Sequence, residues 1–480
     1  MSLNLNEVKI DNESLGFFRF KKLGNEYLLT NDVTYVYLSE QEFKKFLENK
    51  LNNESSAFKE LAKKGFLKNH FSKERIIERY CKRYHFLRNR GVSLHIVVVT
   101  KRCNHLCVYC QAGRAEFQDK KYDMTEETAK KTVDLIFQTP ARNITIEFQG
   151  GEPLLNWNII KFIIEYAKTK NEIFKKNLNF SLVTNLSLMT KDKYMYLTNN
   201  GINLCTSLDG PDHVHNKNRP FYGQKKTHDI VVGWIEKMRE EEKKKKFPKR
   251  ISALPTLTRH SLKHIEEVID EYIKYDLGVI HLRQLSFLGC SSGEENKDKF
   301  GYNAQEFIDA WKKGMDYIIE KNREGVRIAE RGAMIFLKKI LKEIDTNFLD
   351  IRSPCGAGIG QLAYFYDGNV YCCDEGRMVE SDLFILANVY KNKYEDIAES
   401  ERTKTLVTAS TLDNFACDEC VYKTYCGICP VLNYVLYKNL FPNIRATDKC
   451  KIHREMLDYL FTRMKEPDVL DIFKKWIINT

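Results

Sequence analysis

From about residue 92 onward, short apolar runs alternate with segments whose apolar residues recur at helical spacing. The apolar runs span residues 94–99, 143–148, 179–183, 203–207, 251–257 and 280–285. Helices are predicted after the first three of them, over residues 125–137, 157–169 and 191–199. Strands that alternate with helices are typical of a parallel sheet with right-handed crossovers. We therefore predict an α/β fold of six repeated units over residues 91–330.

The first 90 residues follow a different pattern. Three short β-type runs, at 17–20, 27–30 and 33–39, are separated by turn residues. Ser39 and the Glu three positions later form a capping-box pattern that predicts a helix over 40–47, and a second helix is expected over 55–65. We predict a small α+β domain over 1–90, and further divisions at 331–465 and at a C-terminal helix, 466–480.

Composition excludes several classes of protein. The chain is 43% hydrophobic and 29% charged, as in ordinary globular proteins. It has no run of eighteen apolar residues and no apolar signal core at its start, so we predict a cytoplasmic protein without membrane contact. The net charge is +11, but basic residues are interleaved with acidic ones, as in 239–250, which argues against nucleic-acid binding.

Cysteine usage indicates metal binding. The chain has 14 cysteines, and in a cytoplasmic protein such a number favours metal ligation over disulfides. Eleven of them fall into two groups, within 103–110 and 355–450. Cys81, Cys205 and Cys290 lie outside these groups and are expected to act as small apolar side chains.

The first group directly follows an apolar run. Cys103, Cys107 and Cys110 have the spacing Cys-x3-Cys-x2-Cys. Three thiolates can hold three irons of a [4Fe–4S] cluster and leave the fourth iron open, and an open position is what a catalytic metal site needs. Zinc is the alternative, but it needs a nearby fourth ligand, and His105 lies inside the loop rather than at zinc-finger spacing.

This loop resembles that of the radical S-adenosylmethionine (SAM) enzymes. The resemblance implies a partial (β/α)6 barrel of the TIM type. In this family the open iron binds SAM, and a radical made from SAM abstracts a hydrogen atom from the substrate. Tyr109 would lie near the adenine of SAM. As in full barrels, functional residues are expected at the carboxyl ends of the strands.

Further motifs follow the next predicted strands. Gln149-Gly-Gly-Glu-Pro153 resembles the family's Gly-Gly-Glu-Pro motif, which binds the methionine amine. Glycines allow close backbone approach, a carboxylate can accept from an ammonium group, and an arginine can bond both oxygens of a carboxylate. Ordinary turn chemistry is the alternative at several of these positions. The residues expected to bind SAM are Tyr109, Gly150, Gly151, Glu152, Pro153, Asn185, Ser207, Asp209 and Arg219.

The second cysteine group resembles the SPASM extension of radical SAM enzymes that modify peptides and proteins. That extension holds two auxiliary [4Fe–4S] clusters, so the resemblance implies three clusters in all. Cys372 is either a further ligand of the first auxiliary cluster, or that cluster keeps an open iron. A zinc ribbon over 417–429 is the structural alternative. The implied ligands are Cys355, Cys373 and Cys429 for the first cluster, and Cys417, Cys420, Cys426 and Cys450 for the second.

Two spacings depart from the SPASM pattern. Two residues separate Cys426 from Cys429 where the family has three, and no cysteine follows shortly after Cys355.

Asp374 directly follows Cys373, and in sulfatase-maturing relatives an aspartate at this place takes a proton from the substrate. We therefore predict Asp374 as the general base, with a simple turn as the alternative.

The whole layout resembles the SPASM maturases of ribosomally made peptides, including the His-Xaa-Ser system. It implies that a winged-helix-like domain at 1–90 adds the leader of a precursor peptide to its sheet, although a structural cap is the alternative. The predicted product is an oxidative cross-link, a thioether, C–C or C–O bond. The predicted electron donor is a flavodoxin or ferredoxin, whose acidic surface suits the basic chain. The alternatives are a formylglycine-forming sulfatase maturase and a non-catalytic iron–sulfur redox or binding protein.

Overall fold

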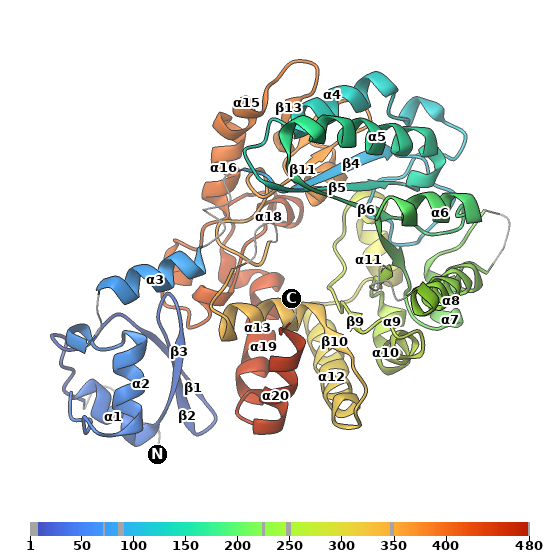
Figure 1. Ribbon diagram of the computed structural model, residues 1–480. Coiled ribbons are helices and arrows are strands. Elements are labelled where there is room, and N and C mark those ends of the chain that lie inside the picture. The colour runs from blue at the N-terminus through green and yellow to red at the C-terminus, as the bar shows by residue number, and fades with distance from the viewer. Residues whose placement is uncertain are drawn as a thin grey trace.

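The computed structural model describes residues 8–70, 73–84, 91–222, 226–245, 251–345 and 350–478. Figure 1 shows a large sheet with covering helices, a small N-terminal unit at one side, and a group of C-terminal helices between the two. The α/β class is confirmed, with the first strand of the core beginning at Leu94.

The main sheet has eight strands in the order β13-β12-β11-β4-β5-β6-β7-β8. β4 to β8 are all parallel, β11 lies parallel to β4, and β12 and β13 continue antiparallel. The parallel strands are β4 (Leu94–Thr100), β5 (Asn143–Gly150), β6 (Asn177–Val183), β7 (Asn203–Ser207) and β8 (Ile251–Leu254), followed by β11 (Gln361–Tyr364), β12 (Asn369–Tyr371) and β13 (Ile385–Asn388).

Local sequence explains where these elements lie. β4 is almost continuously apolar and is buried from His95 to its end, as expected for a parallel strand covered on both faces. The side chains of Thr125 and Thr190 accept backbone N–H groups and set the starts of two crossover helices. These helices are α4 (Glu126–Ile136), α5 (Trp157–Phe174) and α6 (Lys191–Asn199), and α5 is five residues longer than predicted.

The prediction of a sixth core strand over 280–285 is wrong. Only β9 (Val279–Ile280) forms there, and it pairs with β10 (Ala329–Glu330) outside the main sheet. Side chains accept the backbone hydrogen bonds that a neighbouring strand would otherwise accept. The Leu282 N–H donates to the buried Glu330 carboxylate at 3.0 Å, and the Leu285 N–H donates to the Tyr302 hydroxyl at 2.7 Å. In the part of the chain described, the main sheet ends at β8, so the barrel is partial rather than closed.

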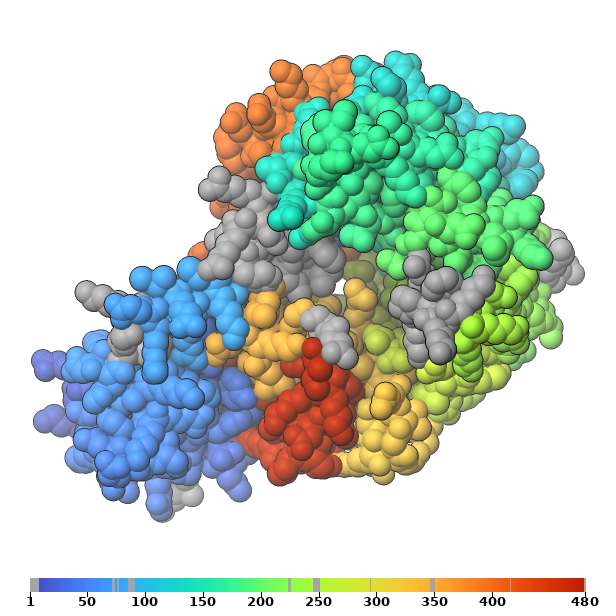
Figure 2. Space-filling view, in the orientation of Figure 1, coloured from blue at the N-terminus to red at the C-terminus, as the bar shows by residue number. Residues whose placement is uncertain are grey.

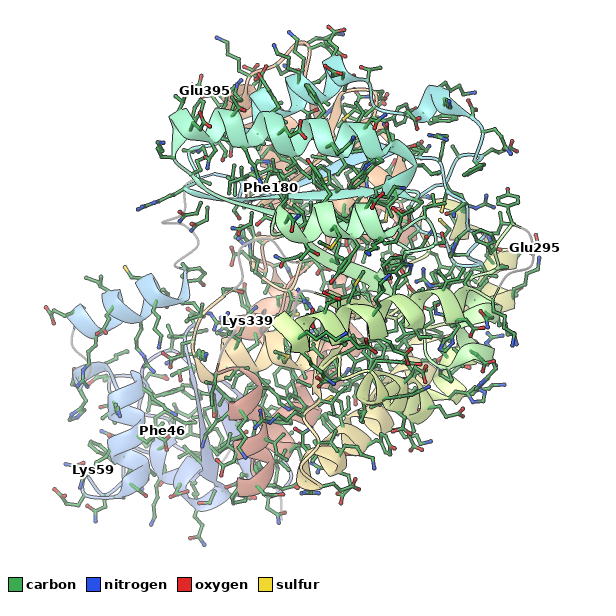
Figure 3. The ribbon with its side chains drawn as sticks, turned by 45° about the vertical axis from the view of Figure 1, so that its right-hand side comes forward. Phe46, Lys59, Phe180, Glu295, Lys339 and Glu395 are labelled. Atoms are coloured by element: carbon green, nitrogen blue, oxygen red, sulfur yellow. The ribbon has the colours of Figure 1, made fainter. Side chains whose placement is uncertain are left out.

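The N-terminal unit has its own apolar core. β1 (Arg19–Leu23), β2 (Glu26–Thr30) and β3 (Tyr35–Ser39) form an antiparallel sheet covered by α1 (Glu40–Leu47) and α2 (Ser56–Lys64). The capping box at Ser39 is confirmed, and Phe43 and Phe46 of α1 are buried. Figure 3 labels Phe46 on this helix. β1 lies two residues later than the predicted 17–20 run.

This unit packs against the C-terminal part of the chain, as the blue and red surfaces in Figure 2 show. Arg19 Nε donates to the Asp418 carbonyl at 2.6 Å, and the Thr30 hydroxyl donates to the Val421 carbonyl at 2.7 Å. The Tyr37 hydroxyl donates to the Phe461 carbonyl at 2.7 Å. The contact therefore joins the N-terminal sheet to the second cysteine group.

The region after residue 330 is largely helical but also supplies β11 to β13 of the main sheet. The sheet thus continues across the predicted boundary, and the division of the chain into domains stays a prediction. No helix in the described part of the chain is both long and apolar enough to span a bilayer. The main helices of this region are α13 (Arg331–Leu341), α18 (Pro430–Tyr437), α19 (Asp448–Arg463) and α20 (Pro467–Trp476). The earlier helix α12 (Ala304–Arg323) packs against α19 and α20.

A substitution in the separate N-terminal core tests its independence. Phe43 is 0% exposed, so Phe43→Ala removes a fully buried ring and should cost about 3–5 kcal/mol. We expect a separate unfolding transition of the N-terminal unit at lower denaturant, measured by circular dichroism and limited proteolysis. Phe17→Ala is the control because Phe17 is 57% exposed. A single transition shifted equally in both variants would contradict a separate core.

Candidate active site

A cavity of about 1420 Å³ runs along one face of the parallel strands, for example from Asn143 at the start of β5 to Gly150 at its carboxyl end, and reaches the loops that follow the strands. It brings together most of the residues that the sequence singled out from both cysteine groups. Those that line it are Cys103, Cys107, Tyr109, Cys110, Gly150, Gly151, Asn185, Ser207 and Arg219 from the core, and Cys355, Cys373, Asp374 and Cys429 from the C-terminal region.

The first cysteine loop is held against the end of β5 by close backbone packing. A Cβ atom on Gly150 would lie 2.4 Å from the Thr100 carbonyl oxygen, and one on Gly151 would lie 2.3 Å from that of Arg102. Asp123 secures the same loop, because it accepts from Arg102 Nε at 2.8 Å and from the Thr100 hydroxyl at 2.6 Å. The two glycines are thus required by the approach of the loop itself.

The thiols of this loop suit a bound iron cluster. No disulfide forms among the described cysteines. Burial raises the pKa of Cys103 to about 12 and also raises that of Cys107, so neither thiolate is stable without a nearby cation. A coordinated metal removes this penalty by deprotonating the thiol outright. Neither ring nitrogen of the buried His105 has a hydrogen-bond partner among the described residues.

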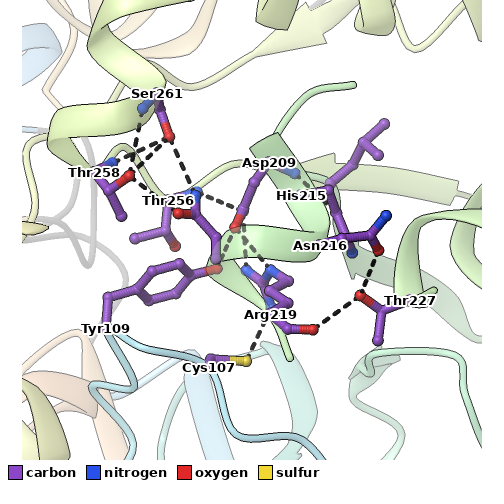
Figure 4. Close-up of polar contacts among 12 residues, drawn as sticks. Cys107, Tyr109, Asp209, His215, Asn216, Arg219, Thr227, Thr256, Thr258 and Ser261 are labelled. Atoms are coloured by element: carbon purple, nitrogen blue, oxygen red, sulfur yellow. Dashed lines mark hydrogen bonds and ion pairs between the residues drawn. The ribbon is translucent and has the colours of Figure 1, made fainter. Parts of the chain in front are cut away.

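A buried ion pair holds two of the predicted SAM-binding residues (Figure 4). Asp209 is 0% exposed and accepts from the Tyr109 hydroxyl at 2.6 Å, from Arg219 Nε at 3.0 Å and from the Thr256 N–H at 2.9 Å. Arg219 Nη1 lies 4.0 Å from Cys107 Sγ. Asp209 is therefore placed to position Tyr109 and Arg219, and a direct contact of its own with SAM stays a prediction.

Glu152 has a similar internal role. Its buried carboxylate accepts from the Thr184 hydroxyl at 2.7 Å, the Asn185 N–H at 2.8 Å and the Leu154 N–H at 3.0 Å. These bonds join the ends of β5 and β6, and burial raises the pKa of Glu152. Pro153 is buried where the short helix η5 (Pro153–Asn156) begins. Contact of either side chain with SAM stays a prediction.

Asp374 is the first residue of α14 (Asp374–Val379) and faces the large cavity. It accepts from Arg377 Nε at 2.8 Å, and Arg377 Nη2 donates to Gln149 of β5 at 2.7 Å. Burial raises the pKa of Asp374, although Arg377 acts against that shift. A raised pKa brings a carboxylate closer to the range of a useful general base. The spacing of Arg377 three residues after Asp374 could have predicted this pairing from the sequence, but Arg377 was not among the predicted residues.

The residues proposed for the first auxiliary cluster lie on one wall of the cavity. Cys355, Cys373 and Cys429 are each nearly fully buried and line it. Cys372 is 0% exposed and does not line it. Its Sγ lies 3.6 Å from Cys373 Sγ and would be only 2.7 Å from a Cβ atom on Gly376. Cys372 thus contacts Cys373 but lies outside the cavity that the other three thiols line.

The remaining cysteines surround a second, smaller cavity. Cys417, Cys420, Cys426 and Cys450 line a space of about 250 Å³, and Phe20 and Lys21 of β1 form part of its wall. The buried Lys339 of α13, labelled in Figure 3, donates to the Cys426 carbonyl at 3.1 Å. Cys429 also lines this space, and the four thiols of Cys417, Cys420, Cys426 and Cys450 fit the donor set of a complete cubane cluster.

The expectation that the isolated cysteines act as small apolar side chains is wrong for Cys81 and Cys290, which are both exposed. Cys290 lies at the first cysteine loop, because the N–H of the next residue, Ser291, donates to the Cys110 carbonyl at 3.2 Å. The turn before it explains the contact, because a Cβ atom on Gly289 would lie 2.2 Å from the Gln111 carbonyl oxygen. This approach joins segments far apart in sequence, and the local pattern around Cys290 gave no sign of it.

Comparison with known proteins identifies the core. Residues 97–277 match the family model of the radical SAM superfamily. This part of the chain is a radical SAM domain. It is 24% identical over 385 residues to the cysteine-type anaerobic sulfatase-maturating enzyme of Clostridium perfringens, covering 78% of this chain and 97% of that enzyme. It is 31% identical over 132 residues to the radical SAM cyclopropyl synthase TigE of Paramaledivibacter caminithermalis, which is 25% of this chain and 27% of the synthase.

Solved structures share the fold. Native anSMEcpe with bound AdoMet and the Cp18Cys peptide has a TM-score of 0.63 and 21% identity, covering 80% of this chain and 99% of that one. SuiB of Streptococcus suis bound to the precursor peptide SuiA has a TM-score of 0.53 and 15% identity, covering 89% and 97%. A radical SAM domain implies SAM and one [4Fe–4S] cluster, and the cavity-lining thiols of Cys103, Cys107 and Cys110 suit that cluster.

The ion pair of Asp209 gives a first test of the SAM site. Asp209→Asn keeps the shape but leaves Arg219 buried without its counter-charge, which typically costs 3–5 kcal/mol. We expect SAM affinity to fall by about tenfold or more, measured by equilibrium dialysis on anaerobically reconstituted protein. Asp229→Asn is the control, because the Asp229 side chain is 65% exposed. Equal SAM affinity in both variants would contradict the positioning role.

Iron counting tests whether Cys372, which lies outside the cavity, is a ligand of the cluster. Cys429→Ala removes a cavity-lining thiol, and we expect it to lose about four irons per chain after reconstitution. Cys372→Ala should keep the full iron content, because its thiol lies away from the cavity. The exposed Cys81 supplies the control variant, Cys81→Ala. Iron loss in Cys372→Ala equal to that in Cys429→Ala would make Cys372 a ligand.

Proposed function

We propose that this radical SAM enzyme matures a ribosomally made precursor peptide by forming an oxidative cross-link. The observation that carries the proposal is one cavity that the first cysteine loop, Asp374 and the thiols of Cys355, Cys373 and Cys429 all line. A peptide side chain in that cavity would be within reach of the radical source, a proton acceptor and an electron acceptor. These three functions together are what an oxidative cross-link requires.

The radical source, the proton acceptor and the electron acceptor are each assigned to different groups. When bound, SAM and its cluster supply a radical that takes one hydrogen atom, and an auxiliary cluster supplies an acceptor for one electron. Asp374 accepts the proton, so hydrogen atom, proton and electron add up to the loss of two hydrogens. Asp209 and Arg219 orient the SAM site, while Arg377 aims the Asp374 carboxylate into the cavity.

The N-terminal unit is the proposed site of leader binding. It is a three-stranded antiparallel sheet with two helices, a form that can add a peptide strand at an edge. A solved structure of the same fold, SuiB, was determined with its precursor peptide bound. The proposed electron donor is an acidic flavodoxin or ferredoxin, drawn to a chain of net charge +11.

Formylglycine formation is the second candidate. It is favoured by the carboxylate of Asp374 directly after Cys373 in the cavity and by the relation to a sulfatase-maturating enzyme along 97% of its length. The two candidates share the radical and proton steps and differ in the substrate. Mass spectrometry of the substrate therefore separates them.

The test is anaerobic co-expression with short peptides encoded beside the gene, followed by intact and tandem mass spectrometry. Loss of two hydrogens at a linked pair of residues, from a peptide that resists fragmentation between them, supports the proposal. Conversion of a single Cys or Ser to formylglycine, in a peptide or in a sulfatase, supports the second candidate. Intact cofactor cleavage with an unchanged peptide would overturn the cross-linking function for that peptide.

Asp374→Asn tests the proton acceptor. We expect cofactor cleavage to continue while peptide modification falls by about 10²- to 10⁴-fold, the usual contribution of a general base. Because burial raises the pKa of Asp374, wild-type modification should decline on acidification at a higher pH than an ordinary aspartate would require. The control is Asp382→Asn, at an exposed aspartate nearby. Wild-type product yields from Asp374→Asn would remove the base from the proposal.

A further inference from the structure

Three histidines meet on the outside of the core, away from both cavities. His213 lies on α7 (Asp212–Asn218), His260 lies on α9 (Arg259–Lys263), and His264 caps the end of α9. One ring nitrogen from each lies within 4.8 Å of the others. The ring of His264 is centred 4.9 Å from each of the other two rings. His213 is exposed and the other two are half-buried, so a solvated ion can reach them.

Contacts between α7 and α9 hold the three histidines in this arrangement. His260 and His264 are four residues apart and share one face of α9. Buried side chains join α7 to α9, since Asn218 Nδ2 donates to Ser261 Oγ at 3.2 Å and the Thr258 hydroxyl donates to Asn218 Oδ1 at 3.1 Å. The histidines therefore face one another because their helices are already locked together.

A carboxylate completes the cluster. Glu267 Oε1 lies 2.6 Å from His264 Nδ1, and Glu267 Oε2 lies 3.5 Å from His213 Nε2. Metal-binding histidines commonly donate their second ring N–H to a carboxylate in this way, which leaves Nε2 of His264 for an ion. Lys217 also acts on His260 and opposes a cation.

We propose that His213, His260 and His264 form a binding site for a divalent transition metal ion of the zinc type. Three imidazoles suit Zn²⁺, Ni²⁺, Co²⁺ or Cu²⁺ better than the oxygen-seeking Mg²⁺ or Ca²⁺. Glu267 orients His264 and supplies the negative charge. The site is structural, because its residues do not line the active-site cavity.

The ion would cross-link α7 to α9 beside the SAM pocket. α7 begins three residues after Asp209 and ends just before Arg219, and the Asp209 N–H donates to His215 Nδ1 of that helix at 3.2 Å. One face of α7 thus supports the Asp209–Arg219 pair while the other carries His213. Binding of an ion that only the folded state can hold raises the thermal stability of that state.

The test uses untagged full-length enzyme, reconstituted with iron and sulfide so that its cysteine sites are filled. After dialysis against Zn²⁺, elemental analysis should find one zinc per chain beyond iron in the wild type. His264→Gln should weaken zinc binding by at least about tenfold and Glu267→Gln by about 10–100-fold. His70→Gln, at an exposed histidine elsewhere, should bind as the wild type does.

Cobalt spectroscopy identifies the ligands. Co²⁺ at the histidines gives weak ligand-field bands without an intense thiolate charge-transfer band, and these bands should be lost in His260→Gln. The melting temperature should rise with Zn²⁺ in the wild type and in His70→Gln but not in His260→Gln. Equal zinc binding by wild type and His260→Gln, or a cobalt spectrum with thiolate bands alone, would overturn the site. Both readouts are independent of turnover, so they hold whatever the peptide substrate is.

Discussion

The active site depends on one close backbone contact, between the first cysteine loop and the end of β5. No side chain fits between them, since a Cβ atom on Gly150 or Gly151 would overlap a carbonyl oxygen of the loop. This contact lets the loop turn back over the sheet and brings Cys103, Cys107 and Cys110 to the carboxyl ends of the strands. The Asp123 carboxylate then anchors the loop through Arg102.

Around that contact, buried charges are arranged in pairs that join distant parts of the chain. Asp209 with Arg219 joins the end of β7 to α7, and Lys449 of α19 pairs with Asp350 beside the C-terminal cysteines. A lone buried charge is expensive, so each pair is stable only if both of its segments are in place. The cavity is therefore organised by polar contacts, while the apolar core beneath it supports the sheet.

Much of the fold followed from local patterns, and much of the site did not. Short, mainly apolar runs predicted β4 to β8, and Ser39 and Thr125 marked helix starts, because strand burial and capping are local properties. The prediction of a sixth strand was wrong because the side chain of Glu330, which is distant in sequence, accepts the hydrogen bond of the Leu282 N–H. The inward turn of Glu152 and Asp209, the contact of Cys290 with the cysteine loop, and the meeting of His213 with His260 all depend on tertiary neighbours.

The wall that β1 contributes to the smaller cavity bears on how the N-terminal unit should be studied. Phe20 and Lys21 stand beside Cys417 and Cys420, so a chain shortened to begin at the core would open that space to water. Oxygen and chelators would then reach these thiols, of which Cys417 is buried in the intact protein, more readily. A truncated chain would therefore confuse loss of peptide capture with damage to a metal centre. Point substitutions on β3, the sheet's other edge, avoid that confusion if they leave Tyr35 and Tyr37, which pack on Phe461, unchanged.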